Sequence, residues 1–385
     1  MGNQTANRKI GIGIIGCGII SSAHVKAYLR LGSQCEIKAV ADISGDKALA
    51  LAAKAGSGVA AYTDYAEMLE RDDIDMVSIC TPPFLHRESV IDVLKAGKHV
   101  LCEKPFAPSL QDCDAMIDEA ERRGLRLGVV FQYRYRKDFK QIRRLVAGGE
   151  LGPIQFAQMN GLYWRGDTYY DEPWTWRGQF ATECGGVTMN HAIHPLDIFL
   201  SVLGDIETVR AEMHTEAHDI EVEDYSSANI RFASGTLGQV NCTLNAAFED
   251  ITMAFSGKYR ALTISRATDE APLQLCAVKK DEPGGFPALD ESALAALQQA
   301  ADEIENGTSD HTGPIQDMFN AIRENREPLV NGREGRRTIE AITAIYKSAT
   351  LGETVLLPIR KDDPWYTREG ILERVVKSNR TRKRE

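Results

Sequence analysis

Short apolar runs alternate with helix-like segments through the first third of the chain, and this alternation limits the fold more than any other feature. The apolar runs cover residues 9–15, 36–41, 76–80, 99–102 and 125–131, and stretches with helical spacing separate them. Strands that lack polar alternation are buried on both faces, as in a parallel sheet covered by its crossover helices. The pattern predicts a doubly wound parallel α/β domain over residues 1–131.

Beyond residue 131 the strands become longer, and several alternate apolar with polar residues. The predicted strands cover 154–164, 208–214, 226–231, 236–245, 251–256 and 261–266, and helices are predicted at 138–147, 194–203, 313–324 and 333–350. Alternation is typical of antiparallel sheets that bury one face. We expect a second, α+β domain over 132–385, built on a large, mostly antiparallel open sheet. The helix at 333–350 is expected to pack back near the interdomain cleft.

The composition excludes several classes of protein. Of 385 residues, 43% are hydrophobic, and 55 acidic against 45 basic residues give a net charge of −10. An acidic balance disfavours nucleic acid, because phosphate contacts need a basic surface. No apolar run approaches the roughly 18 residues that span a bilayer, and the N-terminus lacks the pattern of a signal peptide. These two features predict a protein without nucleic-acid or membrane partners. Eight scattered cysteines with no C-x-x-C pair predict buried free thiols in a reducing, cytoplasmic environment.

A glycine turn after the first strand predicts dinucleotide binding. Gly16-x-Gly18-x-x-Ser21 fits the G-x-G-x-x-G fingerprint with serine in third place, whereas the match that starts at Gly11 would lie inside the strand. Gly16 then forms the turn, and Gly18 lets the pyrophosphate approach the backbone. Backbone N–H groups where the helix begins, at Ile19 and Ile20, would bind that pyrophosphate.

Asp42 ends the second strand, 24 residues beyond Gly18, where an acceptor for the ribose 2′-hydroxyl is expected. No arginine follows it to receive a 2′-phosphate, and a carboxylate repels that group. The combination of strand, glycine turn, helix and acid predicts a Rossmann domain that binds NAD rather than NADP.

A lysine–proline turn follows the strand at 99–102. Residues at the carboxyl ends of parallel strands line the ligand crevice, so Lys104 in Glu103-Lys104-Pro105 could bind a substrate oxygen or transfer a proton. On spacing alone, a surface lysine before a turn is the favoured interpretation. A cis bond at Lys104-Pro105 is plausible.

The chain resembles the glucose–fructose oxidoreductase/inositol dehydrogenase (Gfo/Idh/MocA) family over nearly its whole length. The resemblance rests on Asp42 and on GCGIIS at 16–21, TPPFLH at 81–86, CEKPF at 102–106, ECGGVTMNHAIHPLD at 183–197 and GREGRRTIEAITAIYKSA at 332–349. It implies a Rossmann domain followed by an α+β domain whose open sheet mediates oligomerisation, so a homodimer or homotetramer is expected. It also implies reversible hydride transfer between NAD(P) and a sugar or polyol hydroxyl.

The resemblance also assigns roles to single residues. Lys104 matches the catalytic lysine, and His194 matches the histidine that is usually taken as general acid/base. Positions expected to line the cofactor are Gly16, Gly18, Ile19, Ile20, Asp42, Thr81, Pro82, His86, Glu103, Lys104, Trp176 and Arg177. Inositol-type members carry aspartate where this chain has Asn190. An amide cannot act as a base, although it can bind a substrate hydroxyl, so His194 becomes the main candidate base.

Two further patterns suggest substrate contacts. His191, His194 and Asp197 are spaced three apart, and the ends of such a series diverge by roughly 120°, so no metal site is predicted there. Asp197 would orient His194 or bind a substrate hydroxyl. Between 163 and 177 the chain is dense in aromatic residues and arginine, which suit a pyranose ring and its hydroxyls, although packing under a long loop is an alternative. The residues expected to bind substrate are Lys104, Tyr133, Arg134, Tyr163, Arg165, Asn190, His194 and Asp197.

These expectations combine into one leading hypothesis. The protein would be an NAD-dependent dehydrogenase that oxidises a secondary hydroxyl of a sugar, glycoside or cyclitol to a ketone. The hydroxyl would lie between Lys104 and His194, and His194 would take its proton. Alternatives are a redox-neutral glycoside-processing enzyme that recycles tightly held NAD, a non-catalytic NAD-responsive regulator, and a metal-assisted lyase or hydrolase built on residues 191–197.

Overall fold

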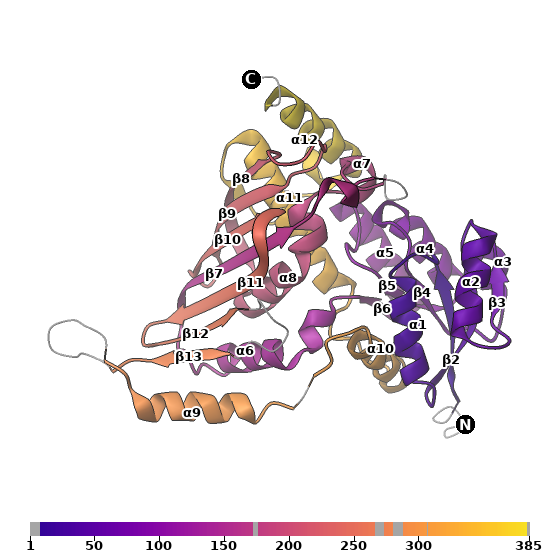
Figure 1. Cartoon of the computed structure of the whole chain (residues 1–385), viewed down its shortest axis with the longest axis horizontal. Helices are drawn as coiled ribbons and strands as arrows, with labels where there is room; N and C mark the ends of the chain where they lie inside the picture. Colours follow the sequence, from indigo (N-terminus) through magenta and orange to yellow (C-terminus); the bar gives the residue numbers. More distant parts are fainter. Residues whose placement is uncertain (1–7, 172–175, 266–272, 280–287, 306, 383–385) are drawn as a thin grey trace. The chain divides into compact units, whose positions relative to one another are not determined.

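The computed structural model describes residues 8–171, 176–265, 273–279, 288–305 and 307–382, with the backbone alone at 376–382 (Figure 1). The chain divides into two compact units. The first comprises Met1–Gln132 and Thr308–Ile339, and the second comprises Tyr133–Gly307 and Glu340–Glu385. Residues 308–339, for which the sequence predicts a place in the second domain, therefore belong to the first unit.

The first unit contains a six-stranded sheet in which all neighbouring strands are parallel, in the order β3-β2-β1-β4-β5-β6. This arrangement confirms the predicted doubly wound fold. The strands are β1 (Ile10–Ile15), β2 (Cys35–Ala41), β3 (Ala60–Tyr62), β4 (Met76–Ile79), β5 (His99–Cys102) and β6 (Leu127–Val129). The helices are α1 (Ser21–Arg30), α2 (Gly45–Ala55), α3 (Tyr65–Leu69), α4 (His86–Lys95), α5 (Leu110–Arg123), α10 (Thr312–Glu324) and the start of α11 (Gly332–Leu351).

The carboxyl ends of four of these strands carry the residues expected to bind the cofactor. Gly16 follows β1, Asp42 follows β2, Glu103 follows β5, and Thr81 lies just beyond β4. Parallel strands end at the same edge of a sheet, and the strand order reverses at β1 and β4, where ligands bind in doubly wound folds. The sheet thus gathers these residues along one edge.

Helix α10 explains why the segment 308–339 belongs to the first unit. Its residues Ile315, Met318 and Phe319 are buried in the same core as Val25 and Tyr28 of α1. Residues three and four apart share one helix face, so the sequence predicts an apolar stripe on α10. The stripe does not specify which core it enters, and the structure shows that it is that of the parallel sheet.

The second unit contains an eight-stranded sheet in the order β13-β12-β11-β7-β10-β9-β8-β14. Among the strand pairs of the described residues, β7–β10 alone is parallel, which confirms the prediction of a mostly antiparallel sheet. The strands are β7 (Ile154–Trp164), β8 (Ile206–His214), β9 (Tyr225–Phe232), β10 (Leu237–Thr243), β11 (Asn245–Gly257), β12 (Arg260–Ser265), β13 (Gln274–Ala277) and β14 (Val355–Leu356). The helices are α6 (Lys137–Ala147), α7 (Phe180–Glu183), α8 (Ile193–Leu203), α9 (Glu291–Asp302), the end of α11, and α12 (Arg368–Arg382).

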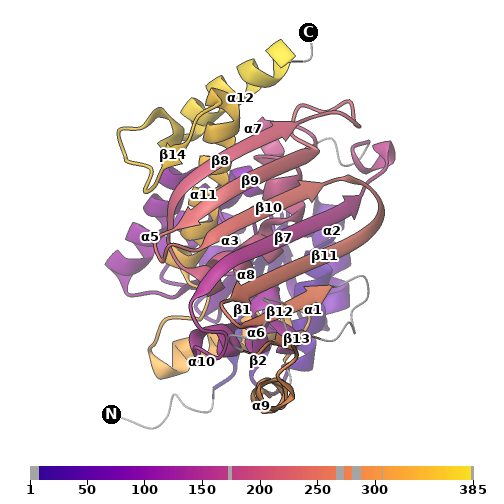
Figure 2. The same cartoon turned by 90° about the vertical axis from the view of Figure 1, so that its left-hand side faces the viewer.

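One face of this sheet is covered and the other is open (Figure 2). On β9, Ser226, Ala228, Ile230 and Phe232 are buried, and the residues between them point to the opposite face. Helix α8 contacts β7 on the covered side. The period of two along each strand is what produces a buried apolar face and an outward polar one.

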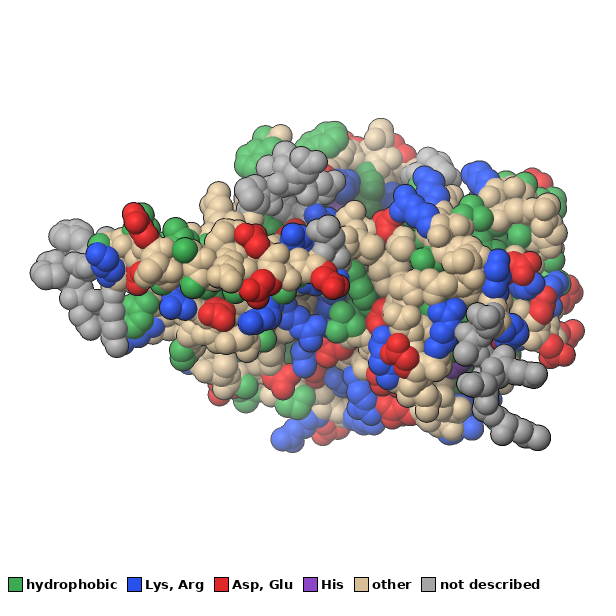
Figure 3. Space-filling model, turned by 90° about the horizontal axis from the view of Figure 1, so that it is seen from below, with side chains coloured by type: hydrophobic (Ala, Val, Ile, Leu, Met, Phe, Trp, Pro, Cys, Tyr) green, Lys and Arg blue, Asp and Glu red, His purple; other side chains and the backbone are tan. Residues whose placement is uncertain are grey.

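Other expectations from composition can be compared with the described residues. Among them, no helix combines the length and apolar character that crossing a bilayer requires. All eight cysteines are free thiols, as the sequence predicts. On the face drawn in Figure 3, acidic and basic side chains are interspersed rather than gathered into one basic field.

Candidate functional site

The glycine turn joins β1 to α1 in a conformation that only glycine suits at position 16. Gly16 has a φ of +91°, and a Cβ there would lie 2.7 Å from the carbonyl of Cys80. Around Gly18, by contrast, nothing lies within 4 Å of the position of a Cβ, so its backbone is accessible to a large group. Ser21 Oγ donates to the Gly18 carbonyl at 2.6 Å and fixes the start of α1. Ile19 and Ile20 complete the turn, and the Ile19 side chain is exposed.

Asp42 ties the end of β2 to the glycine turn. Its Oδ2 accepts the backbone N–H of Cys17 at 2.7 Å, and its Oδ1 accepts that of Ser44 at 2.9 Å. An ionised carboxylate has about four lone-pair positions, so two acceptor positions remain for hydroxyl groups. The carboxylate can therefore bind a ribose while it holds the turn.

The segment after β4 combines a buried hydroxyl with a buried histidine. Thr81 Oγ1 has no hydrogen-bond partner among the described residues. His86 is fully buried, with Nε2 2.9 Å from the Thr81 carbonyl and Nδ1 3.0 Å from the Pro105 carbonyl. Burial lowers the pKa of His86 more than its contacts with the backbone carbonyls raise it. The ring lies between the turns after β4 and β5, and in its neutral form it donates to one of the two carbonyls. Pro82 lies between Thr81 and the 3₁₀ turn Pro83–Leu85.

The first unit therefore fits a dinucleotide. It offers an open glycine backbone, a carboxylate with free lone pairs, and at Thr81 a buried hydroxyl that needs a partner. Buried polar groups in native proteins are nearly always hydrogen-bonded, so the Thr81 hydroxyl points to a bound polar group.

Lys104 lies in a turn that Glu103 holds. The peptide bond Lys104-Pro105 is cis, and Glu103 Oε2 accepts the Lys104 backbone N–H at 3.1 Å. Glu103 Oε1 contacts His24 and His311. Burial raises the pKa of Glu103, but the hydrogen bonds and charge interactions with these two histidines together lower it more. The net pKa lies well below the usual range, so Glu103 is a buried carboxylate. Sequence reasoning missed both histidines.

In the second unit, His194 lies near the start of α8 and is buried against Tyr133. The two rings are stacked, with centroids 4.9 Å apart and planes 30° apart. Tyr133 and His194 were both expected to contact substrate, and the structure brings them together. The π-helical turn Val187–His191 precedes α8 and carries Asn190. Such turns occur frequently at functional sites.

Arg134 and Asp197, which were expected to bind substrate, instead bind each other. Arg134 Nε and Nη2 donate to the Asp197 carboxylate at 2.7 and 2.6 Å, and both side chains are buried. A bidentate pair of this kind fixes its two segments strongly. We therefore assign the pair the role of anchoring α8, and with it His194, rather than that of contacting substrate.

His191 and Arg165 form a second cluster in this unit. Arg165 Nε donates to His191 Nε2 at 3.1 Å and also forms an ion pair with Glu249, and the hydroxyl of Tyr163 donates to the His191 carbonyl at 3.3 Å. Asp197 and His191 thus have separate partners. Among the described residues, the one group of His, Cys, Asp and Glu that could hold a metal ion is His24, Glu103 and His311 rather than the 191–197 series.

The aromatic segment is only partly described. Arg177 lies over the ring of Tyr169, with its guanidinium carbon 3.9 Å from the ring centroid, and Trp176 is half-buried beside it. Trp174 lies outside the described residues. Cation–π contact of this kind holds Arg177 in place.

Two buried acids next to Asn190 were not anticipated. Glu183 accepts hydrogen bonds from the Asn190 amide and from the Gly178 backbone N–H, and Glu223 accepts the Tyr346 hydroxyl at 2.9 Å. An aspartate at position 190 would place a second carboxylate in contact with Glu183, and two carboxylates in such contact cannot both ionise. An amide at position 190 therefore suits this surrounding better than the aspartate of inositol-type proteins.

Glu183 leads to a prediction on pH and stability. Burial raises its pKa from 4.5 to about 7. A raised carboxyl pKa stabilises the folded protein fully below the unfolded pKa, and this contribution is lost as the pH rises through about 7. Relative to Glu183→Gln, the wild type should therefore lose about 3 kcal/mol of unfolding free energy between about pH 5 and pH 8. Urea unfolding across this range measures it. Replacement of the exposed Glu353 by glutamine serves as control. If the difference in unfolding free energy between wild type and variant is independent of pH for Glu183→Gln as well as for Glu353→Gln, the raised pKa of Glu183 is contradicted.

Comparison with known proteins adds independent findings. A family model described as an oxidoreductase family with an NAD-binding Rossmann fold matches residues 10–131, and a Gfo/Idh/MocA C-terminal domain model matches 139–262. The 1,5-anhydro-D-fructose reductase of Ensifer adhaerens is 25% identical over 344 residues, which are 89% of this chain and 96% of that protein. The myo-inositol 2-dehydrogenase of Thermotoga maritima is 28% identical over 242 residues, covering 62% and 69% of the two chains.

A solved structure matches over nearly the whole chain. The WlbA dehydrogenase from Bordetella pertussis, crystallised with NADH and UDP-GlcNAcA, superimposes with a TM-score of 0.79 at 27% identity. The match covers 92% of this chain and all of that one (100%). The fold similarity therefore includes both units.

Proposed function

The chain belongs to the Gfo/Idh/MocA oxidoreductase family, and from this premise we propose that it is an NAD-dependent dehydrogenase that oxidises a secondary hydroxyl of a sugar, glycoside or cyclitol to a ketone. The observation that carries the proposal is the edge of the parallel sheet, where the glycine turn, Asp42, Thr81 and the Lys104 turn follow neighbouring strands. Relatives named as an inositol dehydrogenase and an anhydrofructose reductase support the substrate class.

The cofactor would be held by the first unit. The backbone at Gly18, Ile19 and Ile20 binds the pyrophosphate, and Asp42 accepts the ribose hydroxyls. The buried Thr81 hydroxyl hydrogen-bonds the cofactor from the end of β4. Because His86 and Glu103 are buried, they act by fixing the turns around the cofactor. Trp176 and Arg177 belong to the second unit and remain proposed as cofactor contacts on the basis of the family pattern.

Lys104 and His194 carry the proposed chemistry. NAD⁺ supplies the hydride acceptor when bound. Lys104 donates a hydrogen bond to the substrate oxygen, and neutral His194 accepts the hydroxyl proton while the hydride leaves the same carbon. Asn190, Tyr163 and Arg165 are proposed to bind the other hydroxyl groups.

The preference between NAD and NADP depends on Asp42. Replacing it by alanine should weaken NAD binding about tenfold or more, because a charged hydrogen bond to the ribose is lost, and should relieve the repulsion of a 2′-phosphate. Asp42→Asn is the matched control, since its amide oxygen can still accept the Cys17 N–H. Fluorescence titration with NADH and NADPH measures both affinities. A wild type that prefers NADP by about tenfold would show that Asp42 does not select the cofactor.

The proposed activity is tested by NADH formation from NAD⁺ with a panel of inositols, monosaccharides, glycosides and nucleotide sugars. We expect at least one of them to be oxidised. Glycoside cleavage with no net NADH would indicate the redox-neutral alternative. NADH binding without turnover on any member of the panel would favour a regulator.

We also propose that the open face of the second unit's sheet mediates a homodimer or homotetramer. Its outward residues are mostly uncharged, among them Gln158, Asn160, Asn241 and Thr252, and several are linked by hydrogen bonds. A large face with few charged residues suits burial against a second copy. Sedimentation of the purified protein tests this, and a monomer would contradict it.

Eight free thiols support a cytoplasmic location, which fractionation of the source cells tests.

A further inference from the structure

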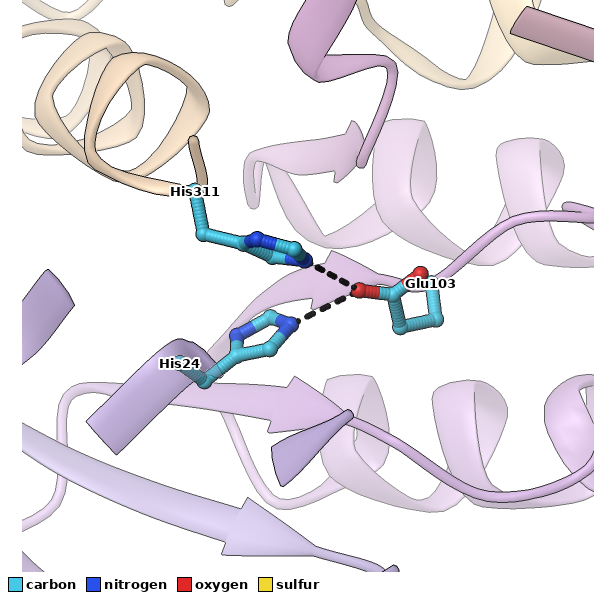
Figure 4. Close-up of side chains that lie close together, drawn as sticks. All are labelled: His24, Glu103 and His311. Atoms are coloured by element: carbon cyan, nitrogen blue, oxygen red, sulfur yellow. Dashed lines mark hydrogen bonds and ion pairs between the residues drawn. The ribbon is translucent and has the colours of Figure 1, made fainter. Parts of the chain in front are cut away.

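A buried chain of polar side chains leads from α1 to α10 and passes through the residue that precedes Lys104. The Tyr28 hydroxyl lies 2.5 Å from Ser78 Oγ, which lies 3.1 Å from His24 Nδ1. His24 Nε2 and His311 Nε2 lie 2.9 and 3.0 Å from the same atom, Glu103 Oε1 (Figure 4). All five side chains belong to the first unit, and each is more than nine-tenths buried.

One assignment of protons satisfies every contact in this chain. An ionised carboxylate only accepts hydrogen bonds, so both histidines donate Nε2–H to Glu103. His24 is neutral, because burial lowers its pKa more than Glu103 raises it, and its Nδ1 therefore accepts the Ser78 hydroxyl. Ser78 in turn accepts the hydroxyl of Tyr28. The two imidazole rings lie 4.8 Å apart, so two cations there would repel each other.

The other oxygen of Glu103 connects this chain to Lys104. Oε2 accepts the Lys104 backbone N–H at 3.1 Å, while Oε1 is held from two sides. A buried carboxylate that has lost one of its donors is costly, whereas a fully hydrogen-bonded one is rigid. The position of the Lys104 backbone therefore depends on the two histidines through Glu103.

We propose that His24 and His311 are positioning residues, which fix the Lys104 turn by holding Glu103 Oε1 from two helices. The proposal rests on the proposed function only in that Lys104 is taken as catalytic. His311 lies outside residues 10–131, to which the Rossmann model was matched, so the segment 308–339 would complete the site rather than only cover the core.

The same three atoms could instead ligate a metal ion, since they lie within 4.8 Å of one another. The distances favour positioning, because each Nε2 lies at hydrogen-bond distance from Glu103 Oε1. A metal would require both nitrogens to be unprotonated and to face a common centre. Metal content is therefore one measurement of the test.

The test compares three variants. His311→Leu removes one donor to Glu103, and His311→Gln keeps a neutral donor of similar reach. Asp310→Asn is the control, because it breaks the surface ion pair between Asp310 and Arg30 in the same segment without touching Glu103. Hydrogen exchange at the Lys104 amide reports the turn directly. The split between kcat and the KM of the sugar, together with NADH affinity, reports catalysis.

We expect His311→Leu to exchange the Lys104 amide about tenfold faster or more and to lower kcat about tenfold or more, with KM and NADH affinity within about twofold of the wild type. His311→Gln should restore both properties, and Asp310→Asn should leave them unchanged. Should His311→Leu not fold, Glu103→Gln replaces it. When the amide oxygen of this glutamine faces the two histidines, its amide nitrogen faces the Lys104 N–H and cannot accept a hydrogen bond from it.

Several results would overturn the proposal. One is wild-type exchange and kcat in His311→Leu, and another is an equal loss in Asp310→Asn. A third is stoichiometric metal in the purified protein that disappears in His311→Leu, since the histidines would then be ligands. A wild type that oxidises no sugar contradicts the proposed function instead, and the exchange comparison still decides on positioning.

Discussion

Replacing Lys104 by methionine is expected to lower kcat by about 10² to 10⁴ while NADH affinity stays close to that of the wild type. Methionine keeps an unbranched stem but removes the ammonium group that would bind the substrate oxygen. The backbone N–H that Glu103 holds is unchanged by the substitution, so the turn itself should persist. Steady-state kinetics and fluorescence titration with NADH separate the two effects.

Lys98, at the other end of β5, offers a matched control. It precedes β5, is buried, and donates from Nζ to the carbonyls of Arg71 and Ile74 at 2.7 and 3.1 Å. Lys98→Met should therefore lower the melting temperature and leave kcat almost unchanged. Equal kcat losses for both variants, or full turnover in Lys104→Met, would remove Lys104 from the catalytic residues.

His194→Asn should cost about 10² or more in the rate of oxidation and remove the rise of that rate with pH. The neutral imidazole is the form that accepts a proton, so oxidation by the wild type should increase as the ring loses its proton, in the range where histidines titrate. Asparagine keeps polarity and approximate size but cannot take up the proton. The pH profile of kcat/KM for both proteins measures the effect.

A structural role for His194 predicts a different outcome. The ring stacks on Tyr133 and lies on the helix that the Arg134–Asp197 pair anchors, so its loss would lower the melting temperature in any case. If the variant melts earlier but retains the wild-type shape of the pH profile, His194 is a packing residue. A flat profile together with the rate loss supports its role as base.

The sequence predicts five of the six strands of the parallel sheet, because each of the five is an apolar run, whereas the three-residue strand β3 was not predicted. Gly16 and Asp42 follow such runs directly and Lys104 follows one residue later, so their common edge is predictable from chain order alone. The β7–β10 pair and the place of α10 are different, since both depend on contacts between distant segments. An alternating or amphipathic pattern identifies a buried face but not its partner.

The side-chain partners in the candidate site were harder to predict for the same reason. His24 lies on the apolar face of α1, where a polar residue is a signal of a buried hydrogen bond, but nothing local indicates that Glu103 and His311 complete it. Arg134 and Asp197 are both charged and near predicted site residues, so a substrate role was the natural interpretation. Their mutual ion pair, formed across 63 residues of sequence, is visible only in three dimensions.

Transfer of deuterium from sugar to cofactor tests the central claim most directly. The purified protein would be mixed with NAD⁺ and a substrate from the panel that carries deuterium at the carbon to be oxidised, and the NADH formed in a single turnover would be examined by mass spectrometry. A dehydrogenase moves that deuterium to the nicotinamide ring, so NADH heavier by one mass unit is the predicted result. Sugar consumption with unlabelled NADH, or with no reduction of NAD⁺ even within one turnover, would contradict hydride transfer and with it the proposed function.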